Sequence, residues 1–121
     1  MNADELRDRT RQFALRIIKL VAALPKSIEG RAIANQLVRY GTSVAANYRA
    51  SCRARSRAEF TAKIGVVLEE ADETLLWLEL IIAAKLLPAK RVEPLLVEAN
   101  ELVAIMVASR KSAASNLKSE I

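Results

Sequence analysis

Four arginines lie within nine positions near the middle of the chain, and they are the first residues whose spacing suggests chemistry. They are Arg49, Arg53, Arg55 and Arg57. Guanidinium groups bind phosphates through paired hydrogen bonds, so this cluster suggests a nucleic-acid contact. The Gly41-Thr42-Ser43 segment before it suggests a phosphate loop, but such a loop needs several glycines at fixed spacing ahead of a helix. A single glycine within a helical pattern does not meet that requirement.

The residue types that are missing exclude several classes of active site. The chain contains no histidine and one cysteine, Cys52. Serine and cysteine hydrolases that depend on histidine are therefore excluded, and so are zinc sites built on cysteine and histidine. The acidic group at positions 69–73 does not indicate a di-metal site, because di-metal bundles also use histidines and inward-facing carboxylates. We predict no catalytic residues, no metal site and no cofactor.

The composition favours long helices. The 121 residues suffice for one domain, 52% of them are apolar, and glycine and proline number only three each. So few turn formers argue against a many-stranded β fold. Apolar side chains instead recur every three or four residues. We predict one all-α domain over residues 1–121, an antiparallel up-down-up-down four-helix bundle. Its helices are expected at residues 3–24, 29–53, 57–87 and 91–118.

Capping residues mark two of the expected helix starts. Asn2 with Glu5, and Ser56 with Glu59, match the capping box, in which the first side chain accepts from the third amide. Prolines end the first and third helices. The stripe of core residues expected in the third helix is Phe60, Ile64, Val67, Ala71, Leu75, Leu78 and Ile82.

The second expected helix carries its arginines on the side opposite its core residues. With the arginines of the following connection they form a basic face, made of Arg39, Arg49, Arg53, Arg55 and Arg57. Three interpretations stay open: a solvated outer face, a surface that binds RNA or DNA, or salt bridges to a neighbouring subunit. Aromatic residues make up only 4% of the chain. We therefore expect contacts with backbone phosphates rather than with unstacked bases.

Polar residues also lie at the edge of the core in this second helix. Gln36, Ser43 and Asn47, the polar seam, need hydrogen-bond partners where they are buried. They either hydrogen-bond between helices or form a small polar site. Gly41, beside them, costs about 1 kcal/mol relative to alanine in a helix. We expect it to allow the close approach of another backbone.

A second apolar face in the third expected helix predicts a homo-oligomer, since one bundle buries only one side of a helix. Opposite charges support contact between copies. Residues 25–55 hold six basic and one acidic residue, whereas residues 56–88 hold three basic and six acidic. Such head-to-tail contact can close into a ring. The expected interface residues are Leu76, Trp77, Leu80, Ala83 and Leu87.

Uncharged stretches are too short for a membrane span. The longest is Tyr40 to Tyr48, whereas a spanning helix needs about 20 apolar residues. The N-terminal sequence MNADELRDRT has no apolar signal-peptide core, and one cysteine cannot form an internal disulfide. We expect a cytoplasmic protein with no membrane contact.

The segment QLVRYGTSVAANYRASCRARSRAEFTAKIGVVLEEADETLLWLEL, residues 36–80, resembles a bacterial family of four-helix proteins encoded by 23S rRNA intervening sequences. Many members have an Ala-Glu-Gly-like segment after the asparagine, where this chain has the basic variant Tyr48-Arg49-Ala50-Ser51-Cys52. The resemblance is carried by Gln36-Leu37, Arg39, Thr42-Ser43-Val44, Ala46-Asn47, Ser56 to Phe60, Glu69 and Leu78-Glu79.

The resemblance implies a homopentameric ring of antiparallel bundles without an established enzyme activity. A related protein, the accessory protein of diversity-generating retroelements, is basic, binds nucleic acid and contacts a reverse transcriptase. We therefore expect a non-enzymatic oligomer that binds RNA or DNA non-specifically through its basic face. The alternative is a protein-interaction scaffold that recruits a protein partner, with its arginines paired to acidic residues of neighbouring subunits.

Overall fold

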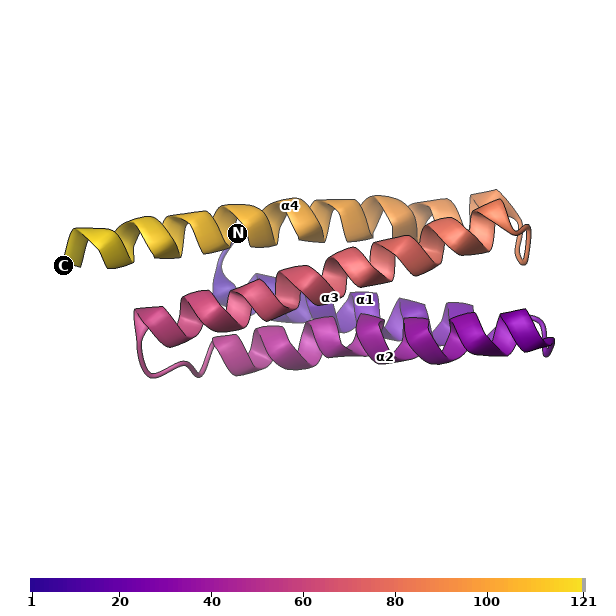
Figure 1. Cartoon of the computed structure of the whole chain (residues 1–121), viewed down its shortest axis with the longest axis horizontal. Helices are drawn as coiled ribbons and strands as arrows, with labels where there is room; N and C mark the ends of the chain where they lie inside the picture. The colour runs from indigo at the N-terminus through magenta and orange to yellow at the C-terminus, as the bar shows by residue number, and fades with distance from the viewer. Residues whose placement is uncertain (121) are drawn as a thin grey trace.

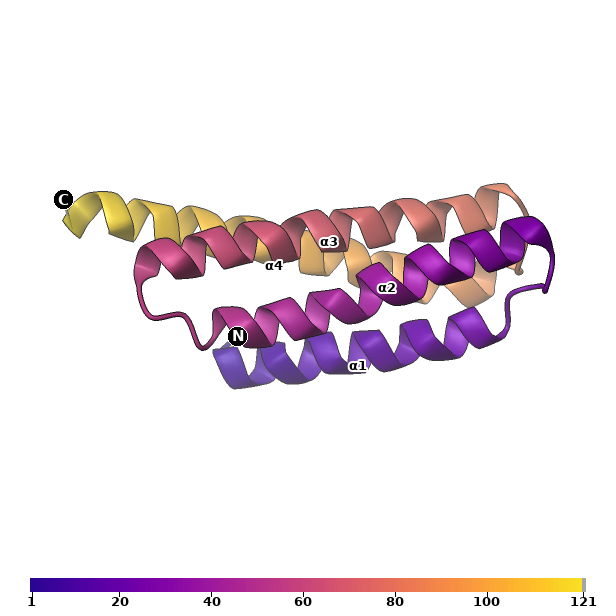
Figure 2. The same cartoon turned by 60° about the horizontal axis from the view of Figure 1, so that its bottom comes forward.

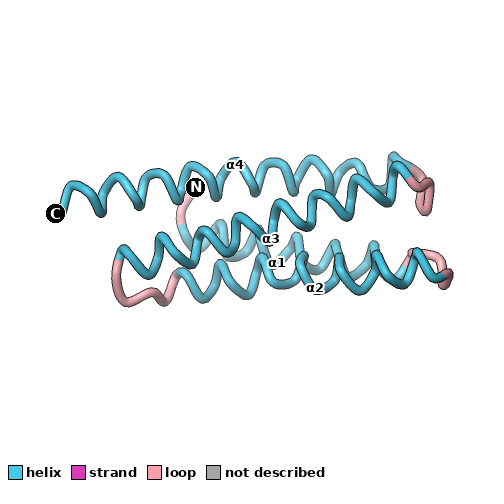
Figure 3. The backbone as a smooth tube through the Cα atoms, viewed as in Figure 1, coloured by secondary structure: helices cyan, strands magenta, loops and turns pink. Residues whose placement is uncertain are grey.

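The computed structural model describes the backbone of residues 1–120 and the side chains of residues 1–116. All regular structure within that part is helical, which confirms the all-α prediction. The connections α1–α2 and α3–α4 lie at one end of the elongated molecule and α2–α3 at the other (Figure 1). All three are short (Figure 3). The helices are α1 (Ala3–Ala22), α2 (Ile28–Ser51), α3 (Arg57–Ala83) and α4 (Ala89–Glu120).

Side-chain caps begin the first three helices. Asn2 accepts a hydrogen bond from the amide of Glu5 at 2.8 Å and donates to the Glu5 carboxylate at 2.9 Å. Ser56 accepts from the amide of Glu59 at 3.1 Å, but the Glu59 carboxylate accepts from the amide of Arg55, one residue before the expected one. Ser27, which the sequence pattern did not single out, caps α2. The two expected caps are thus present.

The end of α3 differs from the expected position at residue 87. The helix ends at Ala83, and Lys85 adopts a left-handed backbone conformation with φ of 57°. The amide of Leu86 donates to the carbonyl of Ile81, and the amide of Lys85 donates to that of Ile82. This is a Schellman motif, which usually has glycine where Lys85 stands. Because lysine gives no sequence signal for it, only the later Pro88 suggested the end of the helix.

Buried positions alternate by three and four residues along each helix, the spacing that lets nearly aligned helices pack. In α3 this register differs from the expected stripe, since Thr74 and Ile81 are buried while Leu75 and Ile82 are only half-buried. Thr74 can lie in the core because its hydroxyl donates to the carbonyl of Glu70 at 2.7 Å. The sequence pattern favoured the apolar neighbour over a threonine whose polar group its own helix satisfies.

Gly41 lies in the buried face of α2 against α1. A Cβ atom added there would lie 2.8 Å from the Cγ2 atom of Ile17, closer than real Cβ contacts allow. The expectation of a close neighbour is thus correct, but that neighbour is a side chain and not a backbone. The missing side chain lets α1 and α2 pack tightly along this interface.

Candidate nucleic-acid interface

The outer side of α2 carries the first members of the basic face. Arg39 and Arg49 are exposed on the helix, about 15 Å apart along its axis at 1.5 Å per residue. Arg53 is exposed in the turn that follows α2, because the helix ends at Ser51 rather than at position 53. None of the three forms an ion pair with any residue whose side chain is described. Their charge is therefore not neutralised within that part of the chain.

One of these arginines is held against an aromatic ring. The guanidinium carbon of Arg39 lies 5.5 Å from the ring centroid of Tyr40, within the range of a cation–π interaction. Tyr40 itself is half-buried. The contact keeps Arg39 along the surface of α2 and covers part of the exposed ring.

A surface groove runs between α1 and α2, which lie side by side in Figure 2. Its volume is about 770 Å³, and the small side chains of Thr42, Ala45 and Ala46 form its α2 side together with Arg49. The α1 side is formed by Arg7, Asp8 and Arg11. The groove thus brings three guanidinium groups and one carboxylate together.

The α1 arginines of this groove were not part of the predicted basic face, which was drawn from the second helix and the connection that follows it. Arg7 and Arg11 are one helical turn apart, and both are exposed. That spacing is visible in the sequence and shows that they share a side of their helix. The sequence does not show which neighbour that side adjoins.

The remaining two arginines of the basic face lie at the α2–α3 connection. Arg55 and Arg57 are exposed and line a second groove of about 460 Å³, together with Tyr48 and Cys52. Burial, reinforced by the neighbouring Cys52, raises the pKa of Tyr48 to about 12. The phenol therefore stays protonated at neutral pH, and it supplies no base for catalysis there.

The polar seam lies on α2, and one of its residues forms a hydrogen bond to α3. The side-chain amide of Asn47 donates a hydrogen bond to the carboxylate of Glu70. Gln36 and Ser43 are half-buried on the same helix. The Asn47 contact is the interhelical kind of hydrogen bond that one of the two interpretations anticipated.

The expected oligomer interface lies on the last turns of α3, with Leu87 in the connection to α4. Leu76 is 45% exposed and Leu80 37% exposed, and Ala83 is exposed as well. Trp77 and Leu87 are half-buried and pack against the core. Part of the predicted apolar surface therefore belongs to the bundle itself, and the exposed part is centred on Leu76 and Leu80.

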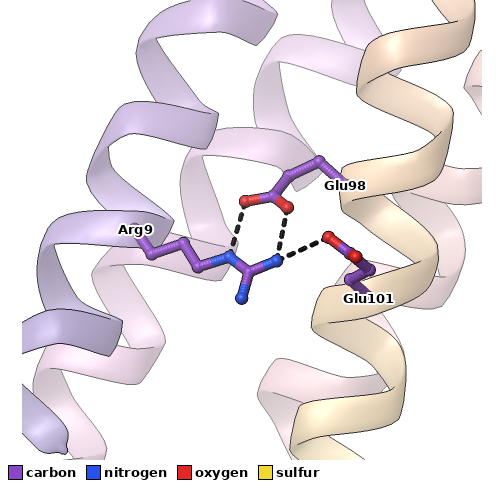
Figure 4. Close-up of polar contacts among 3 residues, drawn as sticks. All are labelled: Arg9, Glu98 and Glu101. Carbon is purple, nitrogen blue, oxygen red and sulfur yellow. Dashed lines mark hydrogen bonds and ion pairs between the residues drawn. The ribbon is translucent and has the colours of Figure 1, made fainter. Parts of the chain in front are cut away.

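A different kind of polar contact joins α1 to α4, two helices whose backbones approach each other closely at far fewer positions than those of the other adjacent pairs. Arg9 donates from Nε and one Nη atom to the two carboxylate oxygens of Glu98, at 2.8 and 2.6 Å (Figure 4). The same Nη atom donates to Glu101 at 2.7 Å. These hydrogen bonds hold the pKa of Glu98 below its ordinary value, with Arg9 as the main cause. We call Arg9, Glu98 and Glu101 the α1–α4 clasp.

The described part of the chain has neither a metal-binding cluster nor a membrane-spanning helix. No three cysteine, aspartate or glutamate side chains there come together in a group that could hold a metal ion. No helix in the same part combines the length and apolar character of a membrane span.

Comparison with models of known families shows which family the chain belongs to. The model of the 23S rRNA-intervening sequence protein family matches residues 4–108, which span α1, α2, α3 and the first part of α4, and the chain belongs to this family. The resemblance inferred from residues 36–80 is thereby confirmed. A comparison with curated proteins found no match.

A solved structure shows the same fold. It is a Bacteroides thetaiotaomicron protein of unknown function from the S23 ribosomal protein family, determined at 1.70 Å resolution. The two sequences are 32% identical, and the TM-score is 0.84. The alignment covers 92% of this chain and 99% of that one. Neither the family description nor this structure names a catalytic activity.

Proposed function

We propose that this protein is a non-enzymatic helical bundle that binds RNA or DNA through backbone phosphates. The observation that carries the proposal is the absence of carboxylate partners for Arg39, Arg49 and Arg53 among the described side chains. Three unpaired guanidinium groups on one side of a protein of net charge +5 attract a polyanion and can replace its counterions.

The form in which the protein acts is part of this proposal. The exposed leucines of α3 and the resemblance to ring-forming relatives support a homopentamer of antiparallel bundles. In such a ring the arginines of several copies would act on one nucleic acid, so weak individual contacts would add up. Because phosphate contacts carry no sequence information, we expect little sequence preference.

A second candidate function is a protein-interaction scaffold, and the acidic side chains around the exposed leucines of α3 favour it. Asp72 and Glu79 are exposed near Leu76 and Leu80. A neighbouring subunit could place its basic face there. The arginines would then be neutralised by the assembly and would not reach phosphates.

The test measures nucleic-acid binding against salt concentration for the wild type and two triple variants. Arg39→Ala, Arg49→Ala and Arg53→Ala together should weaken binding and reduce the salt dependence by about one counterion per arginine removed. A matched control removes three exposed lysines elsewhere, with Lys26→Ala, Lys90→Ala and Lys111→Ala. If the wild type does not bind at low salt, or binds with no salt dependence, the proposal is wrong.

Native mass measurement of a charge-reversed variant separates the two candidates. Arg49→Glu with Arg53→Glu should leave the oligomer intact and abolish nucleic-acid binding under the first proposal. Dissociation into monomers would instead support the scaffold, because its arginines hold the subunits together.

A further inference from the structure

We infer that the nucleic acid bound by this protein is a double helix, and that its phosphates enter the α1–α2 groove between Arg7, Arg11 and Arg49. The inference rests on the proposed function and deepens it in two respects. It adds two arginines of α1 to the binding surface, and it specifies the form of nucleic acid.

The groove has the shape and charge to admit a phosphate backbone. Its α2 side consists largely of Thr42, Ala45 and Ala46, whose small side chains leave its volume of about 770 Å³ open to solvent. Arg49 stands on one side, and Arg7 and Arg11 on the other. A strand lying in the groove would therefore meet guanidinium groups from both helices.

The guanidinium groups are available for exchange with phosphates. Arg11 and Arg49 form no ion pair within residues 1–116. Arg7 pairs with Asp4, but Asp4 is 82% exposed in its side chain, and solvent-exposed pairs contribute little. A phosphate oxygen can replace that carboxylate with little loss. Arg9, on the α4 side of the same helix, is instead fixed by two carboxylates.

The aromatic residues argue against a single strand. Proteins that bind single strands stack the bases on aromatic side chains. All five aromatics of this chain lie within the described residues, and none is exposed. Phe13 and Tyr48 are buried in the core, while Arg39 lies against part of the half-buried ring of Tyr40. The surface thus offers many cations and no fully exposed aromatic ring on which bases could stack.

Charge density then favours the duplex. Double-stranded DNA carries about one charge per 1.7 Å of its axis and releases more counterions per phosphate neutralised than a single strand does. A surface whose attraction is purely electrostatic gains more from the denser polyanion. RNA and DNA duplexes share this phosphate chemistry, so either can satisfy the groove.

Asp8 provides a second, independent marker of the binding position. It is the one acidic residue that lines the groove. A phosphate entering there is repelled by this carboxylate. Asp8→Asn should therefore tighten duplex binding by roughly two- to fivefold, as expected for one like-charge contact near the surface.

The experiment titrates RNA and DNA duplexes, and their separated strands, by fluorescence anisotropy at several salt concentrations. Arg7→Ala with Arg11→Ala should reduce the salt slope for duplexes by about two. The matched control is Arg16→Ala with Lys19→Ala, which removes the same charge from the side of α1 that lines a groove with α4. Circular dichroism and native mass confirm that each variant keeps its fold and assembly.

A second matched pair tests the position of Asp8. Glu93→Gln removes one exposed carboxylate from α4, so it changes the net charge as Asp8→Asn does but far from the groove. We expect tighter duplex binding for Asp8→Asn than for Glu93→Gln. Equal effects of the two substitutions would show that only net charge matters and would overturn the groove assignment.

The outcomes separate this inference from the function on which it rests. Duplex binding that exceeds single-strand binding, with loss in the Arg7 and Arg11 variant, supports the inference. Single strands that bind as tightly as duplexes would overturn the duplex assignment while nucleic-acid binding itself stands. Equal slopes for the two double variants would remove the α1 arginines from the site. If no nucleic acid binds the wild type, the proposed function fails as well.

Discussion

Helix α1 has arginines on the side that faces α2 and on the side that faces α4, and the arginines of the two sides differ in their contacts. Toward α4, Arg9 is 25% exposed in its side chain and is held by Glu98 and Glu101. Toward α2, Arg7 and Arg11 are exposed beside Arg49, in a groove that contains one carboxylate. Arginine therefore links α1 to α4 on one side of the helix, whereas on the other side its charge is free to bind a ligand.

The difference follows from how closely the helices pack. Along the α1–α2 interface Gly41 admits Ile17, and apolar contact joins the helices, so the arginines at its rim are not needed for cohesion. Between α1 and α4 the backbones come close at fewer positions, and charge-assisted hydrogen bonds supply part of the connection. The arginines beside the α1–α2 interface are thus available to a ligand, because apolar packing already joins these two helices.

The largest effect is expected from removing the arginine of the clasp. Arg9→Ala leaves Glu98, 15% exposed in its side chain, without its partner, and should lower the free energy of unfolding by about 2 kcal/mol. Arg11→Ala, two residues away on the open side, should change it by less than about 0.5 kcal/mol. Urea unfolding of both variants measures the contrast, and equal losses would show that the two sides do not differ.

A somewhat smaller loss is expected from filling the close contact on the α2 side. Gly41→Ala places a methyl group against Ile17, where overpacking costs about 1–3 kcal/mol, offset by the gain of about 1 kcal/mol in helix propensity. A net destabilisation of roughly 1 kcal/mol should appear in thermal or urea unfolding. Gly65→Ala is the control, because its nearest neighbour is the flexible end of Arg110 at 3.6 Å. A stabilised Gly41→Ala variant would contradict tight packing at this interface.

The smallest effect concerns pH and the clasp. The pKa of Glu98 is held below its ordinary value of 4.5 when the protein is folded, so the unfolded chain binds the proton more readily. The clasp therefore contributes stability above pH 4.5, and that contribution is lost as the pH falls through the lowered pKa of the folded state. The difference in stability between the wild type and Glu98→Gln should shrink in this acid range. A constant difference from neutral pH to the acid limit would argue that the ion pair is not the cause.

Much of the fold was predictable because local chemistry determined it. The caps at Asn2 and Ser56 lie where the capping pattern placed them, and apolar spacing located all four helices. The two clearest failures were also local in origin. Lys85 occupies a backbone conformation usually taken by glycine, and Thr74 lies in the core with its hydroxyl satisfied by its own helix. In both cases the residue type is one that usually avoids such a position: lysine rarely adopts a left-handed backbone conformation, and threonine is mostly found at the surface.

The candidate site was predictable only in part, because it belongs to two helices. The arginines of the basic face could be found from one helix and the connection that follows it, and all of them are exposed. Arg7 and Arg11 could not be assigned to the same surface, since the rotation of α1 about its axis is set by contacts such as that between Ile17 and Gly41. The residue pattern of one helix shows which side chains share a side of that helix, but it does not show which neighbouring helix that side faces.

By itself the sequence determined that the chain forms four helices, where they begin, and that its cations outnumber its acids. These properties depend on neighbouring residues and on composition. The tertiary structure alone decided which arginines belong to the clasp and which border the open groove. The physical reason is that an arginine's role depends on whether a carboxylate lies within hydrogen-bond distance, and Arg9 and Glu98 are brought together only when α4 packs back against α1.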